Sequence, residues 1–255
     1  MQTLRYIVCI HSAMFNRVSK GVKRFWAQLA LLSIEMIIVI TLFICALVTF
    51  IFVVNRIFVE HRSALDTRVF NYLKGHVSER NNEVLQFFTF LGSHEFLIPA
   101  NLVLIAYFLI KKHKWYSIKI PAIALSSLGL MFVLKHLFNR PRPSIPLLYE
   151  AKGLSFPSGH ALMSVTFYGL LIYIVFKTFK QKGIRWSLIT LLILLILIIG
   201  FSRIYLRVHY TTDVIAGYCI GFLWLVLAVW LLNKIEQQSR RKLNPVVKAE
   251  PTATE

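Results

Sequence analysis

Residues 202–213 read Ser-Arg-Ile-Tyr-Leu-Arg-Val-His-Tyr-Thr-Thr-Asp and join two apolar runs, residues 186–201 and 214–232, in which no residue is charged. Apolar runs of about this length are typical of helices that cross the hydrocarbon core of a membrane. The charged and titratable residues of the junction therefore stand between two predicted membrane helices. Polar groups in such a position either lie at the membrane surface or form a functional site.

The spacing within the junction favours a site. His209 and Asp213 are four residues apart, so on a helix already formed at His209 the carboxylate would lie beneath the imidazole. Such a carboxylate holds one imidazole nitrogen as N–H and leaves the other as a nucleophile or base. Arg203 adds a planar cation that matches two phosphate oxygens. The alternative is an interfacial loop, in which Arg and His flank the membrane helices and Asp213 caps the second one.

The composition indicates a membrane protein. Of the 255 residues, 57% are hydrophobic, which is more than in typical soluble proteins. A net charge of +18 would favour nucleic-acid binding in a soluble chain, but here the Lys and Arg residues flank apolar runs. We therefore expect them to anchor the helices in the membrane, and we expect no nucleic-acid partner. Cys9, Cys45 and Cys219 have neither CxxC nor Cys/His metal spacing, and we interpret them as core residues.

Six apolar runs predict an all-α, polytopic bundle of six membrane helices. They comprise residues 36–54, 87–110, 120–134, 161–176, 186–201 and 214–232. We expect the chain to have three parts: a basic interfacial segment at residues 1–28, a membrane domain at 29–233, and a polar, disordered cytoplasmic tail at 234–255.

Two segments interrupt this helical pattern. Gly92-Ser93-His94-Glu95 lies within the second run and fits either a helix that enters from the surface or a polar wall of a site. Its place near one end of the run favours the surface helix. Between residues 141 and 157, four prolines exclude a long helix and predict a structured loop.

The distribution of Lys and Arg predicts the orientation in the membrane. With the N-terminus in the cytoplasm, the cytoplasmic segments hold eighteen Lys and Arg and the opposite segments hold eleven. The proline-rich loop and the junction at 202–213 then face away from the cytoplasm, and both termini lie in it. We expect a multi-pass protein of the cell (inner or plasma) membrane with an extracytoplasmic active site.

Two further motifs reach the same face. Lys135 and Arg142, at the end of the third run, add two cations to Arg203, and three cations suit a bound phosphate monoester. At the start of the fourth run, Pro157 can begin a helix because no N–H is needed there. Gly159 would let backbone N–H groups approach an anion closely.

His160 is a second imidazole at this anion site, placed to protonate a leaving oxygen. Two histidines with three cations favour phosphoryl transfer through a phosphohistidine over attack by metal-bound water. A metal site is the competing interpretation of any group of His and Asp. Since Asp213 is the only acid within the three motifs and the cations repel a divalent ion, we expect neither a catalytic metal nor a cofactor.

These residues carry a resemblance to a known family. Over about residues 85–233 the chain resembles the type 2 phosphatidic acid phosphatases, which also include glucose-6-phosphatases, bacterial acid phosphatases and vanadium haloperoxidases. The three matching motifs are Lys135-x6-Arg142-Pro143, Pro157-Ser158-Gly159-His160 and Ser202-Arg203-x5-His209-x3-Asp213. Four fixed letters of the third motif would occur by chance in about one window in 10⁵, so the match is specific.

The resemblance implies a six-helix membrane bundle that removes phosphate from lipids without a metal. It implies that His209 is the nucleophile, Asp213 its orienting carboxylate and His160 the general acid. It also implies a phosphate site formed by Lys135, Arg142, Arg203, Ser158 and Gly159. The expected partner is a membrane lipid with a phosphate or diphosphate headgroup, such as undecaprenyl diphosphate, phosphatidylglycerophosphate or phosphatidate.

Two other functions stay open at this point. A phosphotransferase would pass the phosphoryl group from His209 to an alcohol instead of water. A transporter or lipid-binding protein would keep the phosphate site without turnover, although the complete set of nucleophile, orienting carboxylate and acid speaks against it.

Overall fold

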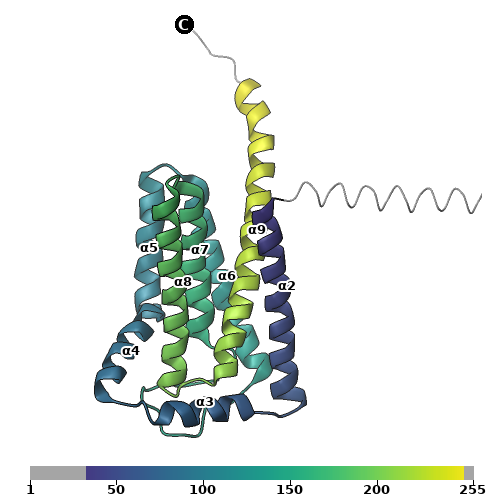
Figure 1. Ribbon diagram of the computed structural model, residues 1–255. Coiled ribbons are helices and arrows are strands. Elements are labelled where there is room, and N and C mark those ends of the chain that lie inside the picture. The colour runs from purple at the N-terminus through teal and green to yellow at the C-terminus, as the bar shows by residue number, and fades with distance from the viewer. Residues whose placement is uncertain (1–32, 250–255) are drawn as a thin grey trace, which may run out of the picture. The chain divides into compact units, whose positions relative to one another are not determined.

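The computed structural model describes residues 33–249, with side chains up to residue 241 (Figure 1). All regular structure within this range is helical, which confirms the all-α class. The elements are α2 (Ile34–Val54), the π-helix η1 (Asn55–Val59), α3 (Ala64–Lys74), α4 (Glu79–Leu91), α5 (His94–Ile110), α6 (Lys114–Phe138), α7 (Gly159–Thr178), α8 (Lys182–Tyr205) and α9 (Thr211–Ala249). The basic segment expected at residues 1–28 lies outside the described residues.

Five helices of the described range are long and apolar enough to cross a membrane, namely α2 (continued by η1), α6, α7, α8 and α9. The pair α4 and α5 meets the same criterion only when both are taken together, and the two are bent by 41° where they meet. The structure therefore has five candidate spans, or six if the bent pair forms one. With either number the chain is a multi-pass membrane protein.

The bend between α4 and α5 coincides with the interruption seen in the sequence. Gly92 follows the last residue of α4, and Ser93 precedes α5 with the extended backbone angles φ −83° and ψ 161°. Glycine is common just after a helix and serine just before one. The second predicted span consequently consists of two helices instead of one.

α9 is longer than the predicted apolar run. It continues past Asn233 to Ala249, so the tail that we expected to be disordered from residue 234 is helical up to that point. Glu236 and Arg240, one turn apart, form an ion pair at 2.9 Å. Such pairs stabilise a helix that has left its apolar surroundings.

α7 packs against α6, α8 and α9 and is the centre of the helices that position the site (Figure 1). Its closest crossing is with α9, where Gly217 and Gly221 lie one turn apart. A Cβ atom on Gly217 would lie 2.7 Å from the carbonyl oxygen of Ser158, and one on Gly221 would lie 2.8 Å from that of Leu162. Small residues four positions apart let membrane helices approach this closely. The crossing brings the first turns of α7 and α9 together.

The proline-rich connection at 139–158 is anchored by a buried aromatic ring. The centroid of Phe156 lies 4.9 Å from that of Phe138, 5.2 Å from Phe58 and 6.4 Å from Phe50. Phe156 itself is fully buried. Because aromatic contacts of this kind bury a large apolar area, they fix the end of the connection beside the start of α7.

Candidate active site

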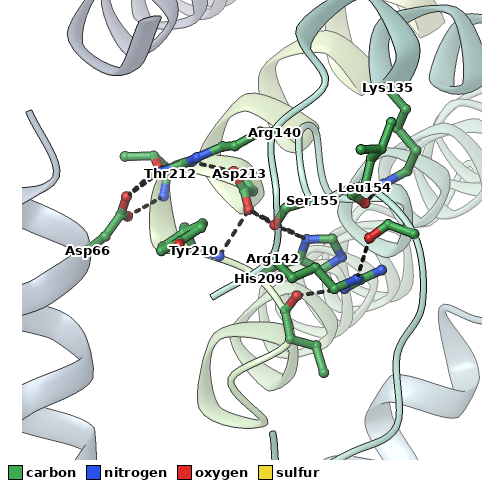
Figure 2. Close-up of polar contacts among 12 residues, drawn as sticks. Asp66, Lys135, Arg140, Arg142, Leu154, Ser155, His209, Tyr210, Thr212 and Asp213 are labelled. Carbon is green, nitrogen blue, oxygen red and sulfur yellow. Dashed lines mark hydrogen bonds and ion pairs between the residues drawn. The ribbon is translucent and has the colours of Figure 1, made fainter. Parts of the chain in front are cut away.

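Two parts of the chain that are far apart in the sequence meet at the candidate active site (Figure 2). One comprises the connection 139–158 and the first turn of α7, which follows it directly, and the other is the junction 206–210 between α8 and α9. The backbone N–H of Ser158 donates to the carbonyl oxygen of Asp213 at 3.0 Å, which ties the start of α7 to the start of α9. The structure thereby brings the three sequence motifs together.

His209 and Asp213 are linked through a third residue. α9 begins at Thr211, so His209 does not lie on the helix that carries Asp213, contrary to the assumption made from their spacing. Nδ1 of His209 is 3.6 Å from Oδ2 of Asp213, which exceeds hydrogen-bonding distance. The hydroxyl of Ser155 lies 3.3 Å from Nδ1 and donates to Oδ2 of Asp213 (Figure 2). Because this hydroxyl gives its only proton to the carboxylate, it accepts from Nδ1–H and leaves the imidazole lone pair on Nε2.

His209 is neutral near pH 7. It is only 2% exposed, and the pKa of its imidazole is lowered to about 4, chiefly by burial and further by Arg203 and Arg142, while Asp213 acts in the opposite direction. A neutral imidazole with a free lone pair is the form that can attack phosphorus.

Asp213 is fully buried and accepts three hydrogen bonds. Besides Ser155, its donors are the backbone N–H of Tyr210 at 3.0 Å and Nη1 of Arg140 at 2.5 Å. A buried carboxylate requires such partners, because it has lost its hydration. The partners also fix the direction in which the carboxylate points.

Arg140 bridges two buried carboxylates. Its Nη1 binds Asp213, its Nη2 lies 3.1 Å from Oδ2 of Asp66, and its guanidinium lies 4.0 Å from the ring centre of Tyr210 (Figure 2). Asp66 belongs to α3 and accepts from both the backbone N–H (2.9 Å) and the hydroxyl (2.8 Å) of Thr212. A side chain of α3 therefore caps the first turn of α9, next to Asp213.

Ser155, Arg140 and Asp66 are not among the residues that the three sequence motifs specify. Ser155 and Arg140 each lie within three residues of a predicted site residue, and this proximity is the one feature of the sequence that could have indicated their place in the site. Asp66 stands in a polar segment outside every motif, and only the folded chain brings it to the site.

Lys135 and Arg142 reach the site, but their donors also hold the connection 139–158 in place. Nζ of Lys135 donates to the carbonyl oxygen of Leu154 at 2.6 Å. Arg142 donates to three backbone carbonyl oxygens at 2.6, 2.9 and 3.0 Å, the shortest bond being to Val208 in the junction. A guanidinium has five N–H groups, so two are left for another acceptor. Burial lowers the pKa of Arg142.

Arg203 and Ser158 carry buried polar atoms without partners. Arg203 is 2% exposed, and its Nη1 donates to the hydroxyl of Thr89 at 3.3 Å, yet its Nε has no partner within the described residues. The same holds for Oγ of Ser158, which is fully buried at the start of α7. Buried polar atoms of this kind normally have a partner, which here would be an ordered water or a ligand. The guanidinium of Arg203 acts electrostatically on the imidazole of His209, so this cation lies near it.

His160 lies on the first turn of α7, within electrostatic range of Arg203 and His209. A Cβ atom on Gly92 would lie 3.4 Å from Cδ2 of His160 and 2.5 Å from the side chain of Ile199. The bend between α4 and α5 is therefore a wall beside this imidazole. The side chains of His94 and Glu95 in the same interruption are mostly exposed. Gly92 therefore lies beside the site, while the polar residues of the interruption agree with the surface helix that we favour.

The start of α7 differs in one respect from the expectation. Ser158 occupies the N-cap, so Pro157 lies outside the helix rather than at its first position. Gly159 is the first helical residue, and a Cβ atom there would lie 2.6 Å from Sδ of Met131. Packing against α6 is thus one reason for this glycine. In the described range, no three His, Cys, Asp or Glu side chains are arranged to hold a metal ion.

Comparison with known proteins shows what this chain is similar to. A family model described as the PAP2 superfamily matches residues 116–237. Phosphatidylglycerophosphatase B of Bacillus subtilis (strain 168) is 30% identical over 158 residues, which cover 61% of this chain and 77% of that protein. Lipid phosphate phosphatase delta of Arabidopsis thaliana is 30% identical over 110 residues, which cover 38% of this chain and 26% of that protein.

Two solved structures have similar folds. The transmembrane PAP2-type phosphatidylglycerolphosphate phosphatase from Bacillus subtilis matches with a TM-score of 0.70 at 24% identity, over 76% of this chain and 96% of that chain. LpxE of Aquifex aeolicus matches with a TM-score of 0.53 at 28% identity, over 65% of this chain and 95% of that chain.

Proposed function

This chain belongs to the PAP2 superfamily and is a phosphatase that acts on lipid phosphates, and we propose that it works through a phosphohistidine formed on His209. The observations that carry the proposal are a neutral imidazole, an arginine close enough to act on it electrostatically, and two buried polar atoms of motif residues that lack a partner within the range that the structure describes, Nε of Arg203 and Oγ of Ser158. A phosphate group would satisfy both and would place phosphorus before His209.

In the first step, the lone pair on Nε2 of His209 attacks phosphorus. The P–N bond forms while the P–O bond to the lipid breaks, and the leaving oxygen takes a proton from His160. Asp213 stabilises the resulting phosphoimidazole, because its charge acts on Nδ1–H through the hydroxyl of Ser155.

In the second step, water attacks the phosphoryl group from the side that the lipid has left. Water gives a proton to His160, the P–N bond breaks, and phosphate leaves. Both histidines then have their initial protonation states. The phosphoryl oxygens would be held throughout by Arg203, Ser158 and the backbone N–H of Gly159, with Lys135 and Arg142 adding charge.

Phosphatidylglycerophosphate is the substrate that we propose first, because the curated relative with the larger coverage is called a phosphatidylglycerophosphatase. The experiment measures phosphate release by the purified protein in EDTA from phosphatidylglycerophosphate, undecaprenyl diphosphate, phosphatidate and a soluble diphosphate. We expect release from phosphatidylglycerophosphate that His209→Ala abolishes. Activity that EDTA removes and Mg²⁺ or Zn²⁺ restores would contradict the metal-independent mechanism.

We also propose that the site faces away from the cytoplasm, which the Lys and Arg distribution supports. Single cysteines at Ser144, in the proline-rich connection, and at Gly183, at the start of α8, lie at opposite ends of the helices and are exposed in the structure. In a cysteine-free protein in intact cells or spheroplasts, an impermeant maleimide should label the first and not the second. The reverse pattern would invert the orientation.

A further inference from the structure

A cavity of about 420 Å³ opens at the other end of the helices from the candidate active site. It lies between the turn that joins α5 to α6, the first residues of α6, and the part of α9 around Glu236. Along α6, Lys114 at the cavity and Lys135 at the active site are separated by roughly 30 Å at about 1.5 Å per residue. The cavity is therefore separate from the catalytic chemistry.

The lining of the cavity has an excess of positive charge. It includes Lys112, Lys114, Lys119 and Arg240, against Glu236 as the one carboxylate among the residues that line it. Glu236 already binds two of these cations, since it lies 2.6 Å from Nζ of Lys119 and 2.9 Å from Arg240. Lys112 and Lys114 have no carboxylate partner within the described residues and are exposed at the cavity. Their two charges are free to meet an anion.

The floor of the cavity is a buried polar network. Lys119 is 5% exposed and donates to Oδ1 of Asn233 and Oε2 of Glu236, both at 2.6 Å. Asn233 in turn donates to the hydroxyl of Tyr173 at 3.3 Å. The network joins α6, α7 and α9, so hydrogen bonds and an ion pair hold the residues of the floor in place. The cavity therefore has a fixed polar base, and the two lysines without a carboxylate partner in the described part of the chain lie at the same cavity. Such an arrangement is a preformed binding site.

Exposed apolar side chains stand within two residues of the lining residues in the sequence. Ile110, just before the turn, is 79% exposed, and Ile118 on α6 and Ile235 on α9 are also exposed. Trp115 and Tyr116 line the cavity, and such residues are enriched where a membrane helix meets the headgroups. An occupant with an anionic head and apolar chains would use both surfaces, which a soluble anion would not.

We propose that this cavity binds the headgroup of an anionic phospholipid in the leaflet opposite to the active site. Basic pockets between membrane helices recognise phosphate headgroups through charge and hydrogen bonds. The bound lipid would hold α6 against α9 and stabilise the folded protein. The proposal does not depend on the roles of the histidines.

The test measures how phosphatidylglycerol raises the thermal unfolding midpoint of the full chain in neutral detergent, because a ligand of the folded state raises it. Phosphatidylcholine of the same chain length and inorganic phosphate serve as ligand controls. The variant Lys112→Gln/Lys114→Gln removes the free charges, and both side chains are exposed, so the fold should persist. The matched control is Lys177→Gln/Lys180→Gln, which removes two exposed lysines outside the cavity, one in the last turn of α7 and one between α7 and α8.

We expect the apparent Kd for phosphatidylglycerol to rise roughly 10- to 30-fold in Lys112→Gln/Lys114→Gln. We expect it to stay unchanged in the control variant and in Arg203→Ala, which alters the catalytic end. If both lysine variants bound phosphatidylglycerol equally more weakly than wild type, the lipid would be attracted only by the general positive charge of the surface. That result would overturn the proposal. So would weakening in Arg203→Ala alone, equal binding of phosphatidylcholine, or a stabilisation of Arg203→Ala by inorganic phosphate as large as that by the lipid, since this variant lacks a main cation of the candidate active site.

Discussion

Nδ1 of His209 lies 3.6 Å from Oδ2 of Asp213, and the hydroxyl of Ser155 fills the space between them. The carboxylate therefore orients the imidazole through a serine that donates to Asp213 and accepts from Nδ1–H. This arrangement leaves Nε2 unprotonated without placing the two charges in direct contact.

The role of Ser155 can be tested by Ser155→Ala. The change removes one hydrogen bond to a buried carboxylate and the acceptor for Nδ1–H, so we expect kcat to fall about 10- to 100-fold, which corresponds to the loss of one charge-assisted bond. KM should change much less, because Ser155 does not contact the phosphate in our proposal. Ser144→Ala, in the exposed part of the same connection, is the control and should behave as wild type. An unchanged kcat in Ser155→Ala would mean that Asp213 orients His209 directly.

Asp66 should affect catalysis although it comes from another helix. Asp66→Asn keeps the shape of the side chain but removes the charge that Arg140 and Thr212 share. Arg140 would then interact with Asp213 alone, and the cap of α9 would weaken, so we expect kcat to fall at least 10-fold.

The measurement compares Asp66→Asn, Arg140→Lys and their combination. Since both residues act through Asp213, the loss in the double variant should be smaller than the product of the single losses. Arg68→Gln, exposed on the same helix, should have no effect. Independent, multiplicative losses would show that α3 and Arg140 do not act together on Asp213.

The lowered pKa of His209 predicts how stability depends on pH. The imidazole takes up a proton near pH 6.5 in the unfolded chain but only near pH 4 in the folded protein. The unfolded state therefore binds more protons between these values, and folding loses stability as the pH falls from about 6.5 to 4. The thermal unfolding midpoint of wild type should fall more steeply in this window than that of His209→Gln, in which the titrating group is absent. Equal slopes would show that His209 titrates normally in the folded protein.

The sequence predicts the membrane helices and the motif residues well, because both depend on local patterns. The spans α6 to α9 follow from long apolar runs, and His160, Arg203, His209 and Asp213 follow from their spacing. What the sequence does not predict is the contact between distant segments. Asp66 reaches Thr212 only because α3 packs against the start of α9, and no pattern within α3 indicates this.

The contact of Gly92 with His160 was not predictable for a related reason. The place of the interruption near one end of an apolar run indicates the surface, and His94 and Glu95 are exposed there. Only the packing of α4 against α8 shows that Gly92 lies beside His160. The assumed direct contact of His209 with Asp213 also depended on where α9 starts, and helix boundaries are the least certain part of a sequence-based prediction.

The proposed mechanism assigns unequal roles to the two histidines. If His209 attacks phosphorus and His160 only protonates the leaving oxygen, the loss of His160 should cost roughly 10²- to 10⁴-fold with a lipid phosphate, and less with an activated ester that leaves without a proton. His209→Ala should lack the covalent intermediate with every substrate.

The most direct measurement is to trap the phosphoenzyme with a labelled activated phosphate ester, quench it, and test its acid lability in wild type, His160→Ala and His209→Ala. We predict an acid-labile phosphoenzyme in wild type and in His160→Ala, and none in His209→Ala. A phosphoenzyme in His209→Ala, or its equal loss in both variants, would contradict His209 as the nucleophile.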